Sequence, residues 1–383
     1  MRNFYFFQAR PANLLLRSFR SIQIISVALI AIWGLGFNNN AAAKTTVRIG
    51  IANVSTDVGF FIADKKGYFK EERIDVTFIA FDSAAKMIAP LGADIYGIPT
   101  TGLLDVGGGA TSADLYNAAA RGINIKIVAD KGSISPGYGF SSLLVRKDLV
   151  DSGKFKSFKD LKGLKVAIGA AGTSTASALN EALKKGGLKY SDVEVVYMGF
   201  PKHALAYANK AIDASITNEP TVTKAVQSGA AVRFAGNDVF YPNQQTAVVL
   251  YGDDFIKNHP DIAKKFMRAY IKAVRYYNDA LKDGKLAGPN ASEVISILTE
   301  YTSIKDPNIH QAIVPNGCNP NGKVFEASLK KDLQFFKEQG WVKGDVTVEQ
   351  VLDQSFADAV VKELGPYKPQ SRESNHDRQS RTR

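Results

Sequence analysis

Three hydroxyl side chains follow a short apolar run near the middle of the 383-residue chain. The run Lys165–Ile168 is suited to a buried strand, and the small residues after it allow a tight turn. Thr173, Ser174 and Thr175 then precede a helical pattern that ends at Gly186. Unpaired N–H groups and the positive end of the dipole make such a helix start attractive to anions. The stretch predicts an anion-binding site, unless the three hydroxyls only cap the helix.

Polar or glycine-rich loops also follow other predicted strands. Because ligands in open α/β sheets bind outside the carboxyl ends of the strands, these loops should line a cleft. Besides the three hydroxyls, the candidate ligand contacts are Thr56, Asp57, Gly108, Gly109, Ser142, Asn218 and Glu219. Each has a structural alternative: Asp57 could cap a helix, the glycines could only form a turn, and Glu219 could be a solvated or hinge carboxylate. Ser142 and Gln244 flank the predicted crossings between lobes and could be hinge or ligand residues.

Strands alternate with helices between residues 47 and 235, which predicts βαβ units and mostly parallel sheets. The predicted strands of the first section are Val47–Ala52, Asp75–Phe81, Leu103–Val106 and Ile123–Ala129. Those of the second section are Ser141–Arg146, Lys165–Ile168, Val193–Met198, Asp213–Thr217 and Val232–Ala235. Thr246–Tyr251 is predicted to return to the first section, and helices follow, among them Asp261–Lys282 and Val324–Gln339.

This order predicts two lobes that are crossed by two strands acting as a hinge. The first lobe should comprise residues 44–140 with 246–365, and the second lobe residues 141–245. The segment Gly92–Thr101 breaks the pattern and is interpreted as an insertion. The polar tail at 366–383 is predicted to be disordered.

The N-terminus has the composition of an export signal. Arginines precede the apolar run Ile22–Phe37, and residues 41–43 supply small side chains for cleavage near Ala43. An uncleaved anchor is the alternative, although the run is short for a membrane span. The signal predicts a periplasmic protein. Both ends are basic, so the formal charge of +11 leaves no basic block in the body, and we expect no nucleic-acid partner.

Cysteine and histidine are too sparse to indicate a catalytic or metal centre. Cys318 is the single cysteine, so no intramolecular disulfide can form. The histidines are widely separated in sequence and show no metal-ligand spacing. We expect no metal, no cofactor and no enzymatic activity.

Several segments together resemble the periplasmic solute-binding proteins of ABC importers in the nitrate, sulfonate and taurine group, which shares its fold with a thiamine-pyrimidine precursor family. The segments are FFIADKKGYFKEERIDVTFI (60–79), LDVGGGATS (104–112), AAARGINIKIVADKG (118–132), FKDLKGLKVAIGAAGTSTASALNEALKKGGL (158–188) and AIDASITNEPTVTKAVQSG (211–229). Their order and spacing cover most of residues 47–250. The resemblance implies an α/β, type II-like fold with two lobes that close on a small molecule, and a monomer that docks on an ABC permease.

Carried over from the resemblance, an anionic head group is expected at Thr173, Ser174 and Thr175 and at the backbone of Gly108 and Gly109. Sulfonates including taurine lead the expected ligands, ahead of nitrate-like anions and aromatic carboxylates. A carboxylate beside a purely anionic ligand costs binding energy, so contact with Asp57 or Glu219 would favour an amine-bearing ligand. The alternatives are a pyrimidine-precursor binder or an enzyme on the same fold. Phe200 and other aromatic residues near the cleft could stack on a ligand, although packing between the lobes is the simpler role.

Overall fold

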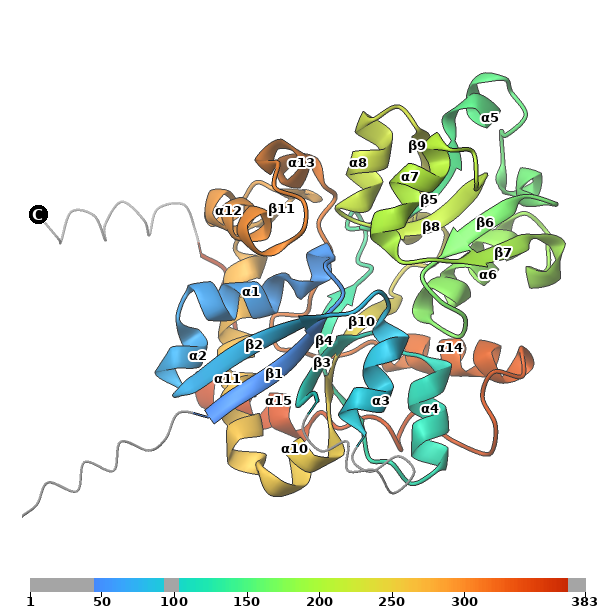
Figure 1. The fold of residues 1–383 in the computed structure, drawn as a ribbon. Coiled ribbons are helices and arrows are strands. Elements are labelled where there is room, and N and C mark those ends of the chain that lie inside the picture. The colour runs from blue at the N-terminus through green and yellow to red at the C-terminus, as the bar shows by residue number, and fades with distance from the viewer. Residues whose placement is uncertain (1–44, 93–102, 371–383) are drawn as a thin grey trace, which may run out of the picture. The chain divides into compact units, whose positions relative to one another are not determined.

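The computed structural model describes residues 45–92 and 103–370 (Figure 1). The predicted signal peptide at 1–43 lies outside these residues, as does the predicted insertion except for Gly92. Residues 371–383 of the tail also lie outside them. The tail residues before these contact the body of the protein, because Tyr367 Oη and Gln370 N both donate to Asp279 Oδ1, at 2.8 and 2.9 Å. The described residues belong to one compact unit with two five-stranded sheets.

The first sheet has the strand order β2-β1-β3-β10-β4. Its strands are β1 (Thr45–Ile51), β2 (Ile74–Ala80), β3 (Val106–Gly109), β4 (Lys126–Ser133) and β10 (Gln245–Tyr251). β1 pairs in parallel with β2 and β3, and β10 is antiparallel to β3 and β4. β10 therefore runs against the other four strands, as predicted for a return strand.

The second sheet repeats this order as β7-β6-β8-β5-β9. Its strands are β5 (Ser141–Arg146), β6 (Lys165–Ile168), β7 (Glu194–Tyr197), β8 (Ala214–Asn218) and β9 (Ala231–Gly236). β6 is parallel to β7 and β8, and β5 is antiparallel to β8 and β9. In each sheet the antiparallel strand is the one that the chain enters after crossing from the other sheet. We call the sheets with their flanking helices the first and second lobes.

The predicted strand Leu103–Val106 is wrong in position, because β3 consists of Val106 and the three glycines that follow it, for which a turn was one of two alternatives. A side chain on Gly108 would place Cβ 2.8 Å from the carbonyl oxygen of Gly50 and 2.8 Å from the ring of Phe60. The glycines are required because neighbouring groups approach the strand closely.

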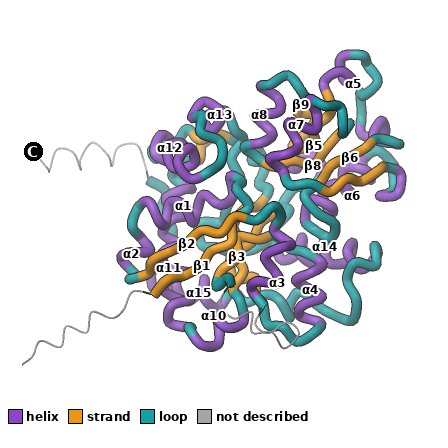
Figure 2. Tube along the Cα trace, in the orientation of Figure 1, coloured by secondary structure: helices purple, strands orange, loops and turns teal. Residues whose placement is uncertain are grey.

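The first sheet is covered by helices on both faces (Figure 2). Along β10, Val248 and Leu250 join one buried cluster, and Val249 and Tyr251 join another, because successive side chains point to opposite faces. The Val249 face is packed by α1 (Val58–Lys65), α11 (Pro260–Asn278), α12 (Ala291–Tyr301) and α15 (Ser355–Leu364). The Val248 face is packed by α3 (Ile88–Leu91), α4 (Ala113–Ala120) and α14 (Glu326–Glu338).

The predicted helix Asp261–Lys282 is wrong at its C-terminal end. α11 ends at Asn278, and a short hairpin of β11 (Leu281–Lys282) and β12 (Lys285–Leu286) follows. Its turn residues Asp283 and Gly284 have φ of 49° and 73°, which suits the Asp-Gly pair of a tight hairpin.

The second sheet is flanked mainly by α6 (Ser174–Lys185), α7 (His203–Ala208) and α8 (Thr221–Gln227). The remaining helices are short: η1 (Ser55–Asp57), α2 (Tyr68–Glu71), η2 (Ala84–Met87), α5 (Lys147–Asp151), η3 (Phe158–Leu161), η4 (Tyr190–Asp192), η5 (Phe200–Lys202), α9 (Asn237–Phe240), α10 (Asp253–Asn258) and α13 (Pro307–Ala312).

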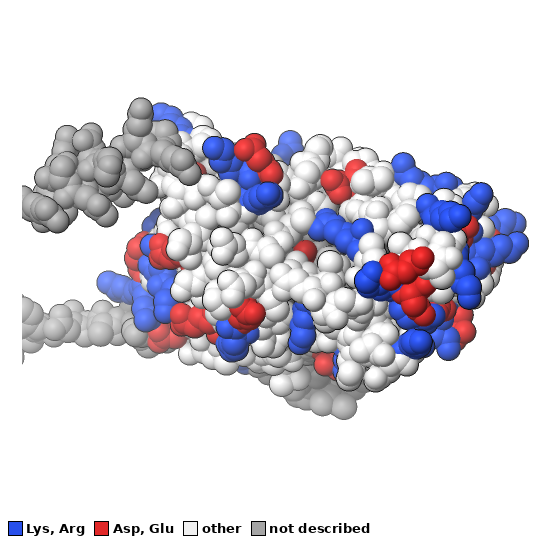
Figure 3. All heavy atoms as spheres, turned by 90° about the horizontal axis from the view of Figure 1, so that it is seen from above, with Lys and Arg blue, Asp and Glu red and all other residues white. Residues whose placement is uncertain are grey.

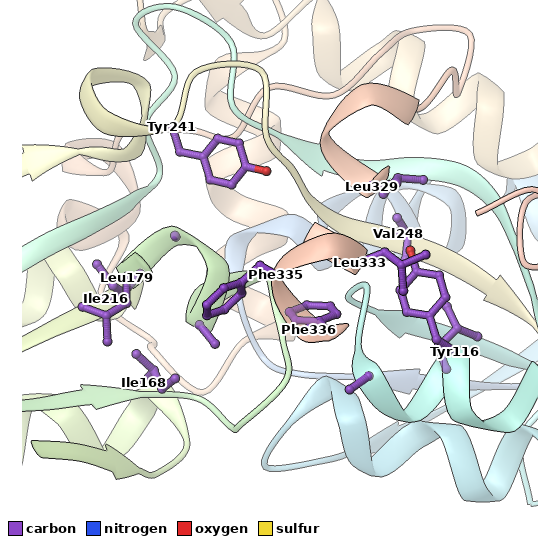
Figure 4. Close-up of a cluster of buried hydrophobic side chains, with 14 of the residues drawn as sticks. Tyr116, Ile168, Leu179, Ile216, Tyr241, Val248, Leu329, Leu333, Phe335 and Phe336 are labelled. Atoms are coloured by element: carbon purple, nitrogen blue, oxygen red, sulfur yellow. The ribbon is translucent and has the colours of Figure 1, made fainter. Parts of the chain in front are cut away.

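α14 joins the cores of the two lobes. Its residues Phe335 and Phe336 lie between Leu179 of α6 in the second lobe and Tyr116 of α4 in the first (Figure 4). Trp341, just after this helix, contacts Phe335, Phe336 and Tyr190 with ring centroids 5.4 to 6.2 Å apart. The C-terminal segment thus packs on both lobes, and one buried cluster runs through them.

Acidic and basic side chains are interspersed over the face shown in Figure 3. Among the residues that the structure describes, no helix combines the length and the apolar character needed to cross a membrane.

Candidate ligand-binding site between the lobes

A cavity lies where loops of the two lobes meet. It contains about 460 Å³ of space, part of it open to solvent. Its lining is made of small, apolar and hydroxyl-bearing residues with one lysine and one asparagine, namely Ala52, Val54, Thr56, Ser83, Ala84, Gly108, Gly109, Ala110, Lys131, Gly169, Ala170, Thr173, Ser174, Thr175, Phe200, Asn218, Thr246 and Ala247. The loops after β1, β3 and β6 and the last residue of β8 all contribute, as the rule for open α/β sheets predicts.

The lobes contact each other around this cavity. Ser55 N of the first lobe donates to Glu219 O of the second at 3.0 Å, and Ala113 N donates to Gly172 O at 2.7 Å. Gly172 has a φ of 58°, and a Cβ there would lie 2.7 Å from Cβ of Ala113, so glycine allows both the backbone turn and the close contact. The structure therefore shows a closed arrangement of the two lobes.

The helix start of α6 faces this cavity with its backbone amides uncapped by side chains. Thr173 Oγ1 donates to Ala170 O at 2.9 Å and lies 3.0 Å from Thr175 Oγ1, while Ser174 Oγ donates to Thr246 O at 2.8 Å. The alternative that the hydroxyls only cap the helix is wrong, because none of them accepts from the first-turn amides. Ala176 N donates to Thr173 O at 2.9 Å, so the N–H groups of Ser174 and Thr175 and the helix dipole are what remain available to an anion.

Lys131 supplies a buried cation at the same cavity. Its Nζ lies 2.6 Å from Asp57 Oδ1 and 2.9 Å from Thr56 Oγ1, and its side chain is 1% exposed. An ammonium has three N–H donors, so this pairing leaves one donor for a ligand. Asp57 Oδ2 accepts from the backbone amides of Ala52 and Val54 at 3.2 and 3.1 Å. Asp57 precedes α1 without capping it, and its carboxylate holds the lysine instead.

The site needs glycine at two further points. A Cβ on Gly132 would lie 2.4 Å from Cγ2 of Thr56, and a Cβ on Gly108 would lie 3.2 Å from Asp57 Oδ1. Both glycines leave room for the pair of residues that contact Lys131. Neither glycine was predicted to have this role.

Glu219 is buried away from the cavity lining and binds the start of α8. Its carboxylate accepts from Thr223 N at 2.9 Å, from Thr223 Oγ1 at 3.0 Å and from Val314 N at 3.3 Å. Arg233 Nη1 lies 3.8 Å from Oε1. Burial raises the pKa of Glu219 to about 7. The alternative of a solvated carboxylate is therefore wrong.

Two residues of the segments that cross between the lobes form hydrogen bonds next to the site. Ser142 Oγ donates to Gly139 O at 3.2 Å and lies outside the lining. Gln244 Nε2 donates to Ser174 O at 2.8 Å, and Gln244 Oε1 accepts from Asn237 Nδ2 at 3.1 Å. Gln244 thus holds the first turn of α6 against the start of β10.

Phe200 is the aromatic residue of the lining. A Cβ on Gly169 would lie 3.0 Å from the ring of Phe200. The ring centroids of Phe200 and His203 are 5.6 Å apart. His203 is buried and pairs with Thr217 Oγ1 at 2.7 Å and Met198 O at 3.1 Å. Burial lowers the pKa of His203 to about 4, so the ring that supports Phe200 is neutral at pH 7.

The structure brings most of the predicted site residues together. Thr56, Gly108, Gly109, Asn218 and the three hydroxyls of α6 line the cavity. Asp57, Ser142 and Glu219 lie outside the lining and have the other partners described above, and their contact with a ligand stays a prediction. Lys131 was missed, although the quoted segment at 118–132 contains it, because the predicted strand ended at Ala129.

A metal or thiol centre has no support in the described part of the chain. No group of three or more His, Cys, Asp and Glu side chains among residues 45–92 and 103–370 could hold a metal ion. The Cys318 thiol is buried, and burial raises its pKa well above the usual range, which makes it a poor nucleophile.

Comparison with known proteins identifies related sequences. Residues 55–280 match the family described as NMT1/THI5 like. A binding protein of Brucella abortus is 26% identical over 286 residues, which cover 74% of this chain and 78% of that protein. The taurine-binding periplasmic protein of Escherichia coli is 25% identical over 282 residues, covering 72% of this chain and 81% of its own.

Solved structures share the two-lobe fold. The alkanesulfonate-binding protein SsuA of Xanthomonas axonopodis, bound to MOPS, has a TM-score of 0.63 at 19% identity, over 82% of this chain and 99% of that chain. The nitrate-binding protein NrtA of Synechocystis has a TM-score of 0.67 at 14% identity, over 84% and 89%. The desulfurization enzyme DSZB has a TM-score of 0.54 at 12% identity, over 84% and 100%. These likenesses confirm the predicted fold class, and they include both binding proteins and an enzyme, so the fold alone does not assign a function.

Proposed function

Because the chain belongs to the NMT1/THI5-like family, as its sequence resemblance predicted, we propose that it is the solute-binding component of an ABC importer. Its ligand is a small organic anion held in the cavity between the lobes. One observation carries this assignment: Lys131 and the uncapped start of α6 line the same cavity, and the lining contains no Asp or Glu.

The charge balance of the site favours a singly charged anion. Asp57 neutralises much of the charge of Lys131, since the two are in contact and both are buried. The remaining attraction comes from the third N–H of Lys131 and from the partial positive charge of the α6 start, which amounts to about half an elementary charge. A sulfonate or a carboxylate, each with a single negative charge, matches this amount of positive charge.

The same balance of charges should make the site bind alkanesulfonates more tightly than taurine. The ammonium of a zwitterion needs an acceptor of opposite charge when it leaves water. Asp57 is occupied by Lys131 and Glu219 by Thr223, and neither lines the cavity. We therefore rank anions without an amine above taurine, although the relative from Escherichia coli is named for taurine.

The importer role implies a permease partner and a periplasmic location. The relatives above include periplasmic binding proteins, and the predicted signal at 1–43 would export this chain. Closure of the lobes on a ligand would present the permease with a distinct surface, because a ligand that binds the closed state better shifts the population toward it. We propose no enzymatic step, since the lining offers no thiol or imidazole.

A thermal-shift panel tests the proposal. The protein is unfolded and refolded to remove carried-over ligand, then mixed with ethanesulfonate, propane-1-sulfonate, butanoate, benzoate, nitrate, taurine and an aminopyrimidine. A ligand at a hundred times its dissociation constant adds about 2.7 kcal/mol to the free energy of unfolding, which raises the melting temperature by several degrees. We expect shifts with the sulfonates or carboxylates and a smaller one with taurine. A shift with the aminopyrimidine alone would overturn the anion assignment.

A further inference from the structure

Two oxygen atoms in the cavity lining are buried and have no hydrogen-bond partner among the described residues. They are Asn218 Oδ1 and Thr246 Oγ1, in residues that are 6% and 2% exposed. The hydroxyls of Thr173 and Ser174, in the same lining, all have partners. The lining therefore contains a paired set of hydroxyls at the helix start and an unpaired set elsewhere.

Further unpaired oxygens lie next to Asn218. Ser141 is its direct partner across strands β5 and β8, and directly opposed side chains share one face of a sheet. Ser55 also lies close to Asn218, because Ser55 N donates to the carbonyl oxygen of Glu219, the residue after Asn218. Both Ser55 Oγ and Ser141 Oγ are buried without a partner among the described residues. Unpaired oxygens thus cluster around the end of β8.

Such a cluster is costly unless something completes it. A buried polar atom without a hydrogen bond costs about 1–3 kcal/mol, and native proteins keep few of them. The end of β8 adjoins the ligand cavity, so a group on the ligand can reach it. An amide side chain both donates and accepts, and a threonine hydroxyl does the same.

We propose that Asn218 and Thr246 bind an uncharged hydrogen-bonding group of the ligand, so that the preferred ligand is an organic anion that carries a hydroxyl. This inference rests on the proposed function and names the chemistry of the ligand's second group. A hydroxyl matches the unpaired oxygens because it donates one hydrogen bond and accepts another. An ammonium would leave water without a carboxylate to pair with, and a methyl group would leave the oxygens unpaired.

Calorimetry with probes that differ in one group tests the inference. The first pair is 2-hydroxyethanesulfonate and propane-1-sulfonate, and the second pair is 3-hydroxypropanoate and butanoate. Within each pair a hydroxyl replaces a methyl group of similar size. We expect the wild-type protein to bind the hydroxyl member at least tenfold more tightly in whichever pair it accepts, because sites built to bond a hydroxyl reject the analogue that lacks it.

Two variants assign the preference to the residues. Asn218→Leu and Thr246→Val keep the approximate side-chain volumes and remove the oxygens, and each should reduce the hydroxyl preference to threefold or less. Asn209→Leu, at an exposed position outside the lining, is the matched control and should keep it. If Asn218→Leu does not fold, Thr246→Val decides the question.

The outcomes separate this inference from the function on which it rests. Equal binding of both members by the wild-type protein overturns the inference and leaves the importer role standing, since water then satisfies the oxygens. A preference that survives in the folded variants also overturns it. If neither pair binds while another anion of the thermal-shift panel does, the inference fails and the proposed anion ligand stands; if no anion binds at all, both fail.

Discussion

The pair of Lys131 and Asp57 provides the sharpest test of the site. Lys131→Met would leave the carboxylate of Asp57 buried without its cation, and breaking a buried pair in this way costs about 3–5 kcal/mol. We expect about 3 kcal/mol, because Asp57 keeps its hydrogen bonds from the amides of Ala52 and Val54. Asp57→Asn should cost a similar amount, since it leaves a buried lysine unpaired.

The double variant Lys131→Met/Asp57→Asn should lose less free energy than the two single changes together, by about 2–3 kcal/mol, because no unpaired charge remains. Urea unfolding of the four proteins measures this difference. The surface pair Lys65 and Glu300, whose side chains are 47% and 50% exposed, is the control and should couple by less than about 0.5 kcal/mol. A coupling below about 1 kcal/mol for the buried pair would refute the reasoning.

The same variants separate stability from binding. The double variant should lose about 3–4 kcal/mol, no more than slightly beyond either single change, and still bind anions at least tenfold more weakly than the wild-type protein, because the cation of the cavity is gone. Calorimetry with the tightest-binding anion of the panel measures this. Wild-type affinity in the double variant would show that Lys131 serves only the fold.

Three other predictions concern titration, glycine and packing. Burial raises the pKa of Asp332 to about 7, above the unfolded value of about 4, so the folded state keeps this proton to a higher pH. The stabilising contribution of the protonated group is full below pH 4 and is lost as the pH rises through 7. Asp332→Asn should therefore flatten the decline in unfolding free energy between about pH 4 and pH 7 by up to about 1.4 kcal/mol per pH unit, and the exposed Asp345→Asn should not. Gly132→Ala should destabilise the protein by about 1–3 kcal/mol through its clash with Thr56, and Thr56→Ser, which removes the methyl group, should restore part of this in urea unfolding; no recovery would contradict the contact. Trp341→Ala should cost about 2–3 kcal/mol, and Trp341→Phe less, as measured by the same method; equal losses would show that ring packing is not the cause.

The fold could be predicted from the sequence wherever local pattern decides. Alternating strands and helices gave the two sheets, and Thr246–Tyr251 was recognised as the return strand because it follows the second section. The three glycines of β3 misled the prediction, since glycine usually marks a turn, and here close contacts require it in a strand. The Asp283-Gly284 turn carried a local signal for a hairpin that was not used.

The loops that line the site could be predicted from the sequence, but the hydrogen-bond partners of its buried side chains could not. Thr173 and Asn218 could be placed because Thr173 follows a strand and Asn218 ends one, and strand ends meet at one edge of a sheet. The partner of Lys131 lies 74 positions away in the chain, and no local pattern distinguishes a buried lysine from a solvated one. The same holds for Glu219, which binds Val314 at a separation of 95 positions.

The placement of β10 and α14 has a consequence for how the chain acquires its structure. The first sheet has a gap between β3 and β4 until β10 is available, and α4 and α6 expose apolar faces until α14 covers them. During synthesis from the N-terminus, neither lobe can complete its core before residues beyond 325 have been made. A chain that completes its cores so late stays unfolded for most of its synthesis, and this would suit the export that we propose for it, in which the chain crosses a membrane before it folds.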